Sequence, residues 1–332
     1  MELGVIFERE IREQPDVWER LAGGDAARRL AAAIDGDALL VGSGSSYFAA
    51  QLGAVALRRR GIGAHALAAT EAQGDSKAYQ GKIVIAISQS GRSSDVLAAL
   101  DVLHPRRVIA VTNTVVSPLG ERSDVTLDVA AGPEYAIPAT KSVTATAIVL
   151  LSAASLLSGD TTRSAAVLID TARAVRAWLR EAPGIVDAAN AIAARRDVMV
   201  LGTDYGAPIA RETALKFKEA TYLHAEGFEA GEFRHGSAAM LDATSVVLAV
   251  MDHDGETIVA RPLREAAKTG ALRYVIGART IDELPRLGPV VDEAFNTLAW
   301  LVTAQMLALF AARARGIDSD TPRGLTKSIV NE

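Results

Sequence analysis

Two serine-rich loops carry the residues of this sequence that are best suited to binding an anion. They read "GSGSSY" (Gly42 to Tyr47) and "SQSGRSS" (Ser88 to Ser94), and each follows a short apolar run and precedes a helical pattern. A helix N-terminus offers backbone N–H groups and the positive end of its dipole, and serine hydroxyls add donors. Serine is also a common helix cap, but two such loops favour a phosphate site. Neither loop matches a nucleotide P-loop or a complete dinucleotide fingerprint.

A carboxylate and a lysine suited to proton transfer lie in "ETALKFKEATYLHAEGFEAGEFRHG" (Glu212 to Gly236). Ketose–aldose interconversion needs a base that takes a proton beside a carbonyl and returns it to the next carbon, and Glu219 could do this. Lys216 precedes Glu219 by three residues, which places both on one helix face. Spacing alone favours a surface ion pair that contributes little.

The remaining composition excludes several kinds of site. His224 and His235 could form a metal site with Glu226 or Glu232, but we favour a structural role for His224 and expect neither metal nor cofactor. The 332 residues contain no cysteine, which excludes disulfides and thiolate chemistry. A net charge of −5 suggests no nucleic-acid partner. The first residues show no signal-peptide core, so we expect a cytoplasmic protein with no membrane partner.

Buried strands separated by helices must position these residues. Continuous runs of Val, Ile and Leu are typical of parallel strands buried on both faces, and such sheets bind ligands beyond the carboxyl ends of their strands. The apolar helical stretches 147–157 and 298–312 are predicted to be core helices, too short to span a membrane. The predicted strands are residues 38–42, 83–88, 107–112, 125–129, 198–202, 245–251 and 272–277.

The two halves of the chain begin alike, since "LLVGSGSSYFAA" and "MVLGTDYGAPIA" both run from strand through glycine and a polar loop into a helix. We therefore predict an α/β fold of two doubly wound αβα domains with parallel sheets rather than one large sheet. The predicted ranges are 1–160 for the first domain with its N-terminal helix, 161–316 for the second, and 317–332 for a tail that carries Lys327.

Several motifs in a fixed order resemble one family. They are "EIREQP" (Glu10 to Pro15), the two serine loops, "TNTVVSPL", "AGPEYAIPATKS" (Ala131 to Ser142), the segment from Glu212 to Gly236, and "LTKSIVNE" at the end. Over nearly its whole length the chain resembles the SIS (sugar isomerase) family of phosphosugar-binding domains. Within that family it looks most like the isomerase part of glutamine–fructose-6-phosphate aminotransferase and the related glucosamine-6-phosphate deaminases.

The resemblance implies a role for each matching residue. Glu219 matches the base that moves a proton between C1 and C2, and Lys216 and Lys327 match active-site lysines. His235 matches the histidine that opens the sugar ring and comes from the neighbouring subunit, which implies a homodimer with shared active sites. The implied phosphate contacts are Ser46, Ser88, Gln89, Ser90 and Ser93. The implied sugar-side contacts are Ser43, Gly44, Ser45, Ile137, Ala139 and Thr326.

Two positions depart from the family's pattern. Ala139 stands where the aminotransferase has serine, and "HGS" (His235 to Ser237) replaces the usual "HGP". The aminotransferase hydrolyses glutamine with an N-terminal cysteine, and this chain begins almost directly at the isomerase part, so glutaminase activity is not expected.

We expect an enzyme that converts an aminohexose 6-phosphate, such as glucosamine 6-phosphate, into fructose 6-phosphate and ammonia. A ketosamine-6-phosphate deglycase of the fructoselysine 6-phosphate type is one alternative. A non-catalytic phosphosugar sensor is another, although no helix-turn-helix segment is apparent before Ala38.

Overall fold

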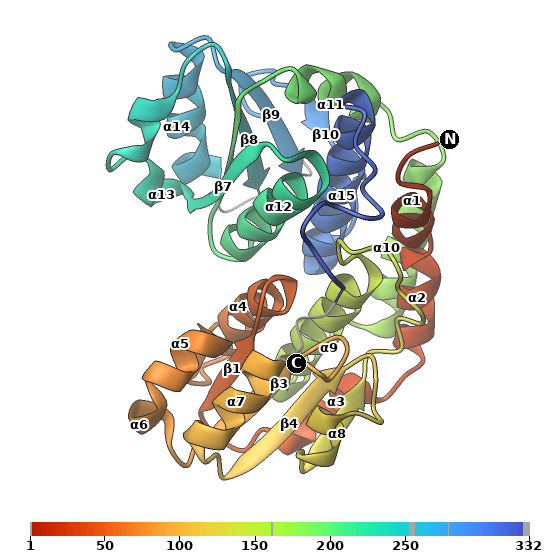
Figure 1. Ribbon diagram of the computed structural model, residues 1–332, viewed down its shortest axis with the longest axis vertical. Helices are drawn as coiled ribbons and strands as arrows, with labels where there is room; N and C mark the ends of the chain where they lie inside the picture. The colour runs from red at the N-terminus through yellow and green to blue at the C-terminus, as the bar shows by residue number, and fades with distance from the viewer. Residues whose placement is uncertain (1, 161, 252–255, 278, 328–332) are drawn as a thin grey trace. The chain divides into compact units, whose positions relative to one another are not determined.

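A computed structural model describes residues 2–160, 162–251, 256–277 and 279–327, and it contains two parallel five-stranded sheets (Figure 1). The first has the strand order β2-β1-β3-β4-β5, and the second has the order β10-β9-β8-β6-β7. Read from the other edge, the second sheet repeats the order of the first, so the chain uses one doubly wound topology twice. The predicted α/β fold with two parallel sheets is confirmed.

The first sheet is covered by helices on both faces, because its strands are apolar on both sides. Leu39 and Val41 of β1 face α5 and α7, with which they form one buried cluster. Helices α3 and α9 pack together, as do α4 and α9, and α4 also lies against β1. The strands are β1 (Ala38–Gly42), β2 (Ala64–Ala68), β3 (Ile83–Ile87), β4 (Arg107–Thr112) and β5 (Val125–Asp128). The helices are α2 (Gln14–Ala22), α3 (Ala26–Ala33), α4 (Ser45–Arg58), α5 (Ala69–Gly74), α6 (Ser76–Tyr79), α7 (Ser94–Leu103), α8 (Pro118–Glu121), α9 (Lys141–Leu157) and α10 (Ala165–Leu179).

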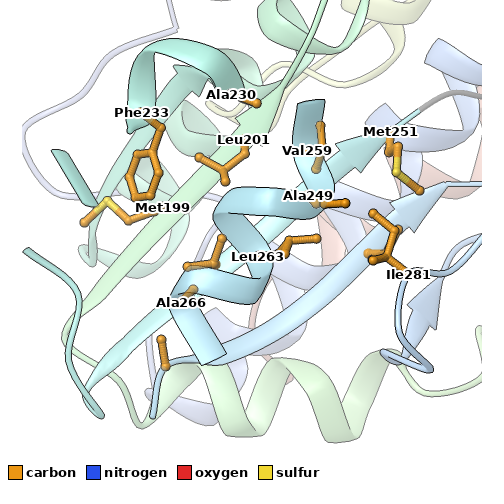
Figure 2. Close-up of a cluster of buried hydrophobic side chains, with 14 of the residues drawn as sticks. Met199, Leu201, Ala230, Phe233, Ala249, Met251, Val259, Leu263, Ala266 and Ile281 are labelled. Carbon is orange, nitrogen blue, oxygen red and sulfur yellow. The ribbon is translucent and has the colours of Figure 1, made fainter. Parts of the chain in front are cut away.

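The second sheet is also covered on both faces. Figure 2 shows Val259 and Leu263 of α14 beside Ala249 of β8, and Phe233 of α13 near Leu201 of β6. Helices α11, α12 and α15 pack together, and α12 and α15 also contact strands of the sheet. The strands are β6 (Asp197–Gly202), β7 (His224–Glu229), β8 (Ser245–Met251), β9 (Leu272–Gly277) and β10 (Arg286–Leu287). The helices are α1 (Val5–Arg12), α11 (Ile185–Ala193), α12 (Gly206–Thr221), α13 (Ala230–Phe233), α14 (Glu256–Ala267) and α15 (Asn296–Ala314), with short 3₁₀ turns η1 (Ser237–Met240) and η2 (Glu293–Phe295).

The apolar stretch 298–312 belongs to a longer helical segment than predicted. Residues Glu293–Ala314 are long and apolar enough to cross a membrane, so the prediction that this segment is too short for a span is wrong. Of its most apolar window, 89% is buried inside the fold. The segment is therefore accounted for as the core helix of the second sheet.

The chain divides into two compact units whose ranges differ from the predicted domains. One unit comprises Met1–Pro15, Tyr135–Thr140 and Asp170–Leu325, and the other comprises Asp16–Glu134, Lys141–Ile169 and Thr326–Glu332. The N-terminal helix α1 thus groups with the second sheet, and most of the described tail does so too. The predicted boundaries at 160 and 316 stay a prediction. The last five residues of the predicted tail, 328–332, lie outside the described residues.

Candidate functional site

The two serine loops leave adjacent strands of the first sheet. Residues 43–44 connect β1 to α4, and residues 88–93 connect β3 to α7, while β1 and β3 pair in parallel. In the order β2-β1-β3-β4-β5 the chain turns to opposite sides after β1 and β3, which makes this pair the topological switch point. Ligands of doubly wound sheets bind in the crevice at that point.

Glycines give both loops their tight course. Gly44 has φ +56° and Gly91 has φ +64°, values that residues other than glycine rarely adopt. A Cβ on Gly91 would also lie 2.1 Å from the Ser117 hydroxyl oxygen. At Gly42 a Cβ would lie 2.6 Å from the backbone carbon of Ser46, so glycine is needed for the return of the chain into α4.

The hydroxyls of Ser46, Ser88 and Ser93 do not serve as helix caps in the described part of the chain. Ser93 occupies the N-cap of α7 but its hydroxyl makes no capping hydrogen bond. The N-cap of α4 is Gly44, which has no side chain. The Ser90 hydroxyl accepts a hydrogen bond from the Arg92 N–H at 3.2 Å. Within the described part of the chain, the hydroxyls of Ser46, Ser88 and Ser93 make no such bond, which leaves them available to a ligand. Capping therefore does not explain the serines.

The end of β4 supports the second loop. The Gln89 carbonyl accepts hydrogen bonds from the Asn113 N–H at 3.1 Å and the Thr112 hydroxyl at 3.3 Å. The Asn113 side chain then bonds the next segment, since its amide donates to the Gly132 carbonyl and its oxygen accepts from the Ala131 N–H. Asn113 thus joins the second serine loop to residues 131–132.

Lys327 forms an ion pair with the buried carboxylate of Glu134, a residue that was not predicted to belong to the site. Its ammonium lies 3.0 Å from Glu134 Oε2, and the Glu134 side chain is 0% exposed whereas that of Lys327 is 26% exposed. The N–H and hydroxyl of Ser142 also donate to Glu134. Thr326 precedes Lys327 in the same unit and is exposed.

The segment with Ile137 and Ala139 is held by α1 and the tail. Both oxygens of the buried Glu10 carboxylate accept hydrogen bonds from backbone N–H groups, Tyr135 at 2.5 Å and Ala136 at 3.2 Å. The Ile137 N–H donates to the Asp320 carbonyl. Ile137 and Ala139 are half-buried. The "EIREQP" motif thus contributes a carboxylate that shapes the predicted sugar-contacting segment.

Helix α12 carries a buried triad of charges. Lys216 Nζ lies 2.6 Å from Glu219 Oε2 and 3.4 Å from Glu212 Oε1. The Lys216 and Glu212 side chains are each 1% exposed and that of Glu219 is 17% exposed, so this is not the surface ion pair that spacing alone suggested. Burial would lower the pKa of Lys216, but the Glu212 and Glu219 carboxylates outweigh it and raise the pKa to about 12. Lys216 is therefore an ammonium at neutral pH.

The two histidines are placed differently. His235 lies between α13 and η1, and its side chain is exposed. Its backbone N–H donates to the Glu232 carbonyl. His224 Nδ1 lies 3.3 Å from Asp197 Oδ1 at the start of β6. No group of three or more His, Asp or Glu side chains within the described ranges could hold a metal ion.

The predicted residues fall into two sets, one in each compact unit. The serine loops, Thr326 and Lys327 lie in the unit of the first sheet, and Lys216, Glu219, His235, Ile137 and Ala139 lie in the other. The first set can bind a phosphate and present an ammonium. The second can move a proton with a carboxylate whose charge is balanced by a buried lysine. Sequence reasoning missed Glu134, Glu212 and Asn113, although each stands in a motif that it singled out.

Comparison with known proteins matches the two sheets separately. The family model described as SIS domain matches residues 35–156 and again residues 191–312. The glutamine–fructose-6-phosphate aminotransferase (isomerizing) of Aeropyrum pernix is 31% identical over 98% of this chain and 57% of its own length. The chain thus spans little more than half the length of that curated relative.

Solved structures show the same fold. The C-terminal domain of glucosamine-fructose-6-phosphate aminotransferase from Francisella tularensis superposes with a TM-score of 0.81 and 23% identity, covering 96% of this chain and 98% of that one. Glucosamine-6-phosphate deaminase from Thermotoga maritima gives a TM-score of 0.79 and 23% identity, covering 98% and 100% of the two chains. At this identity the likeness shows the architecture alone.

Proposed function

The chain belongs to the SIS domain family, and from that premise we propose that it is an aminosugar-phosphate deaminase. The reaction is glucosamine 6-phosphate, or a close epimer, plus water to fructose 6-phosphate plus ammonia. The proposal depends on the presence of two features in one chain. Serine hydroxyls that do not cap helices lie at the β1/β3 switch point, and the Glu219 carboxylate forms an ion pair with a buried lysine. A phosphosugar isomerase needs both.

Each step is assigned to a group of this chain. The serine loops bind the 6-phosphate with hydroxyl and N–H donors. His235 opens the pyranose ring and exposes the C1 aldehyde. Glu219 takes the proton from C2 and returns it to C1. The C1 oxygen gains a proton and the C2 amine loses one, so that a C1 hydroxyl and a C2 imine are formed. Water adds to that imine and ammonia leaves, so fructose 6-phosphate is formed.

Lys216 and Lys327 provide positive charge during this sequence. Lys216 stays protonated, and its ammonium lies 2.6 Å from Glu219 Oε2. Lys327 assists at C1 or C2, where negative charge develops on oxygen. Glutamine plays no part in the proposed reaction, since free ammonia is its product.

The names of the similar proteins support this choice of substrate. One is an aminotransferase that acts on fructose 6-phosphate, and one is a glucosamine-6-phosphate deaminase. We also propose a cytoplasmic homodimer in which His235 completes the partner's site, because on its own chain His235 is exposed. No nucleic acid or membrane takes part.

Release of ammonia from a panel of sugar phosphates tests the proposal. Glucosamine, galactosamine and mannosamine 6-phosphates are assayed beside fructoselysine 6-phosphate, with unphosphorylated glucosamine and the Glu219→Gln variant as controls. We expect ammonia from one hexosamine 6-phosphate and almost none from either control. Cleavage of fructoselysine 6-phosphate alone would replace the proposal by a deglycase, for which Ala139 leaves more room than serine. Binding without turnover of any compound would indicate a sensor.

A further inference from the structure

Glu134 stands out as a buried carboxylate without an assigned role. Its side chain is 0% exposed, yet it lies in an irregular segment that leads into α9 rather than in a helix or strand. A buried carboxylate is costly unless donors and a positive charge compensate it. Its surroundings therefore show what it is built to bind.

Two sources of compensation lie within the described residues. The N-terminal turn of α9 supplies the Ser142 N–H at 3.0 Å from Oε1 and the Ser142 hydroxyl at 2.8 Å from Oε2, where the helix dipole also favours an anion. The second source is the ammonium of Lys327, 3.0 Å from Oε2 and 193 residues away in the sequence. The neighbouring Lys141 donates to the Pro133 carbonyl at 2.5 Å and fixes the backbone just before Glu134.

We propose that Glu134 is the positioning residue of Lys327: it fixes the ammonium near the end of the chain at the place where the reaction needs it. This inference rests on the proposed function. The Glu134 carboxylate is held by Ser142 of α9 independently of Lys327, so it forms a fixed acceptor for the lysine ammonium. Holding a reactive group in place in advance removes an entropic cost from the chemical step.

The position of Glu134 is linked to the second serine loop, residues 88–93. Asn113 bonds the Gln89 carbonyl on one side and residues 131 and 132 on the other, and Glu134 follows two residues later. Asn113, directly after β4, is thus hydrogen-bonded both to the second serine loop and to the segment that leads to Glu134. This attachment sets the place of Lys327 relative to the bound phosphate.

A double-mutant cycle tests whether Glu134 acts through Lys327. Glu134→Gln keeps the shape and one oxygen to accept from the Ser142 N–H, but it removes the charge and replaces the acceptor of Lys327 by an NH2 group. Lys327→Met removes the ammonium. We expect each single change to lower kcat/KM at least tenfold, mainly through kcat, and the double variant to be no worse than Lys327→Met. Losses that multiply would overturn the proposal, because Glu134 would then act independently. Glu121→Gln, an exposed carboxylate of the same unit, is the matched control.

Hydrogen exchange of the full chain gives a readout that needs no activity. Amides of residues 323–327 should exchange faster in Glu134→Gln than in the wild type, and equally fast in Lys327→Met. Lys327→Arg should retain protection, and this comparison holds even if Glu134→Gln fails to fold. Unchanged exchange in Lys327→Met would overturn the proposed role of Glu134. An inactive wild type with faster exchange in Lys327→Met would instead refute the proposed function and leave that role intact.

Discussion

At the scale of single residues, the charges on α12 decide which group can act as the base. Lys216 lies among carboxylates that raise its pKa to about 12, so it cannot take a proton near neutral pH. Glu212 is buried, whereas Glu219 is the more exposed of the two carboxylates. Because Glu219 is the more exposed carboxylate, we propose it, rather than Glu212 or Lys216, as the base.

Glu219→Gln should lower kcat at least about a hundredfold and leave KM within a few-fold, because the amide keeps the size but cannot accept the proton. Steady-state kinetics with the active hexosamine 6-phosphate measure this. Glu226→Gln on β7, an exposed position, is the control. A variant with near wild-type kcat would exclude Glu219 as the base.

Lys216→Met should destabilise the fold by about 3–5 kcal/mol at pH 8, because the buried Glu212 carboxylate loses its partner. Adding Glu212→Gln should recover much of that loss. The folded pKa of Lys216 lies above the ordinary 10.5, so its contribution is complete below pH 10.5 and is lost as the pH rises toward about 12. Denaturant unfolding should therefore show the difference from wild type shrinking across that interval. A constant difference would contradict the ion-pair account.

At the scale of elements, prediction from sequence succeeded where burial is two-sided. Strands β1, β3, β4, β6, β8 and β9 were predicted because their apolar runs are buried on both faces. The edge strand β5 was predicted too, from the alternation of Val125, Leu127 and Val129 with polar residues, although it is only partly buried. Strands β2 and β7 were missed, since they lie at sheet edges and carry half-exposed and polar residues that break the pattern. The edge strand β10 has only two residues.

The candidate site divides in the same way. The serine loops could be predicted because they follow strongly apolar strands directly. Glu134 and Asn113 lie in irregular segments, where no periodicity indicates whether a polar side chain is buried. Their roles depend on contacts with Lys327 and Gln89 that are distant in sequence, so only the three-dimensional structure shows them.

Removing two loop hydroxyls should weaken binding of the phosphorylated substrate in particular. Each charge-assisted hydrogen bond contributes on the order of 1.5–3 kcal/mol, so Ser88→Ala and Ser93→Ala should each raise KM about tenfold or more. Their effect on the weak binding of unphosphorylated glucosamine should be small. Ser158→Ala, near the end of α9, is the control. Equal losses for glucosamine and its 6-phosphate would contradict the phosphate assignment.

At the scale of the whole molecule, one doubly wound topology occurs twice with different residues at equivalent places. The loop after β1 is rich in serine, whereas the loop after β6 contains Asp204, whose negative charge disfavours a phosphate. In the proposed function the first unit binds the anion and the second carries the proton-transfer residue on α12.

Mixing inactive variants tests the proposed homodimer. In a C₂ dimer with shared sites, a His235→Ala chain and a Glu219→Gln chain can together form one complete site. Co-refolding the two should restore up to about a quarter of wild-type activity, since half of the dimers are mixed and one of their two sites is intact. Absence of any recovery, with subunit exchange confirmed, would show that His235 acts within its own chain.

Exchange of the C1 proton of fructose 6-phosphate tests whether the chain is a phosphosugar isomerase with Glu219 as its base, because the exchange requires both the phosphate site and the base. The protein is incubated with fructose 6-phosphate in D₂O, with and without ammonium, and deuterium at C1 is followed by NMR. We expect deuterium uptake by the wild type, little uptake with Glu219→Gln, and little uptake from unphosphorylated fructose. No uptake by the folded wild type under either condition would contradict this assignment.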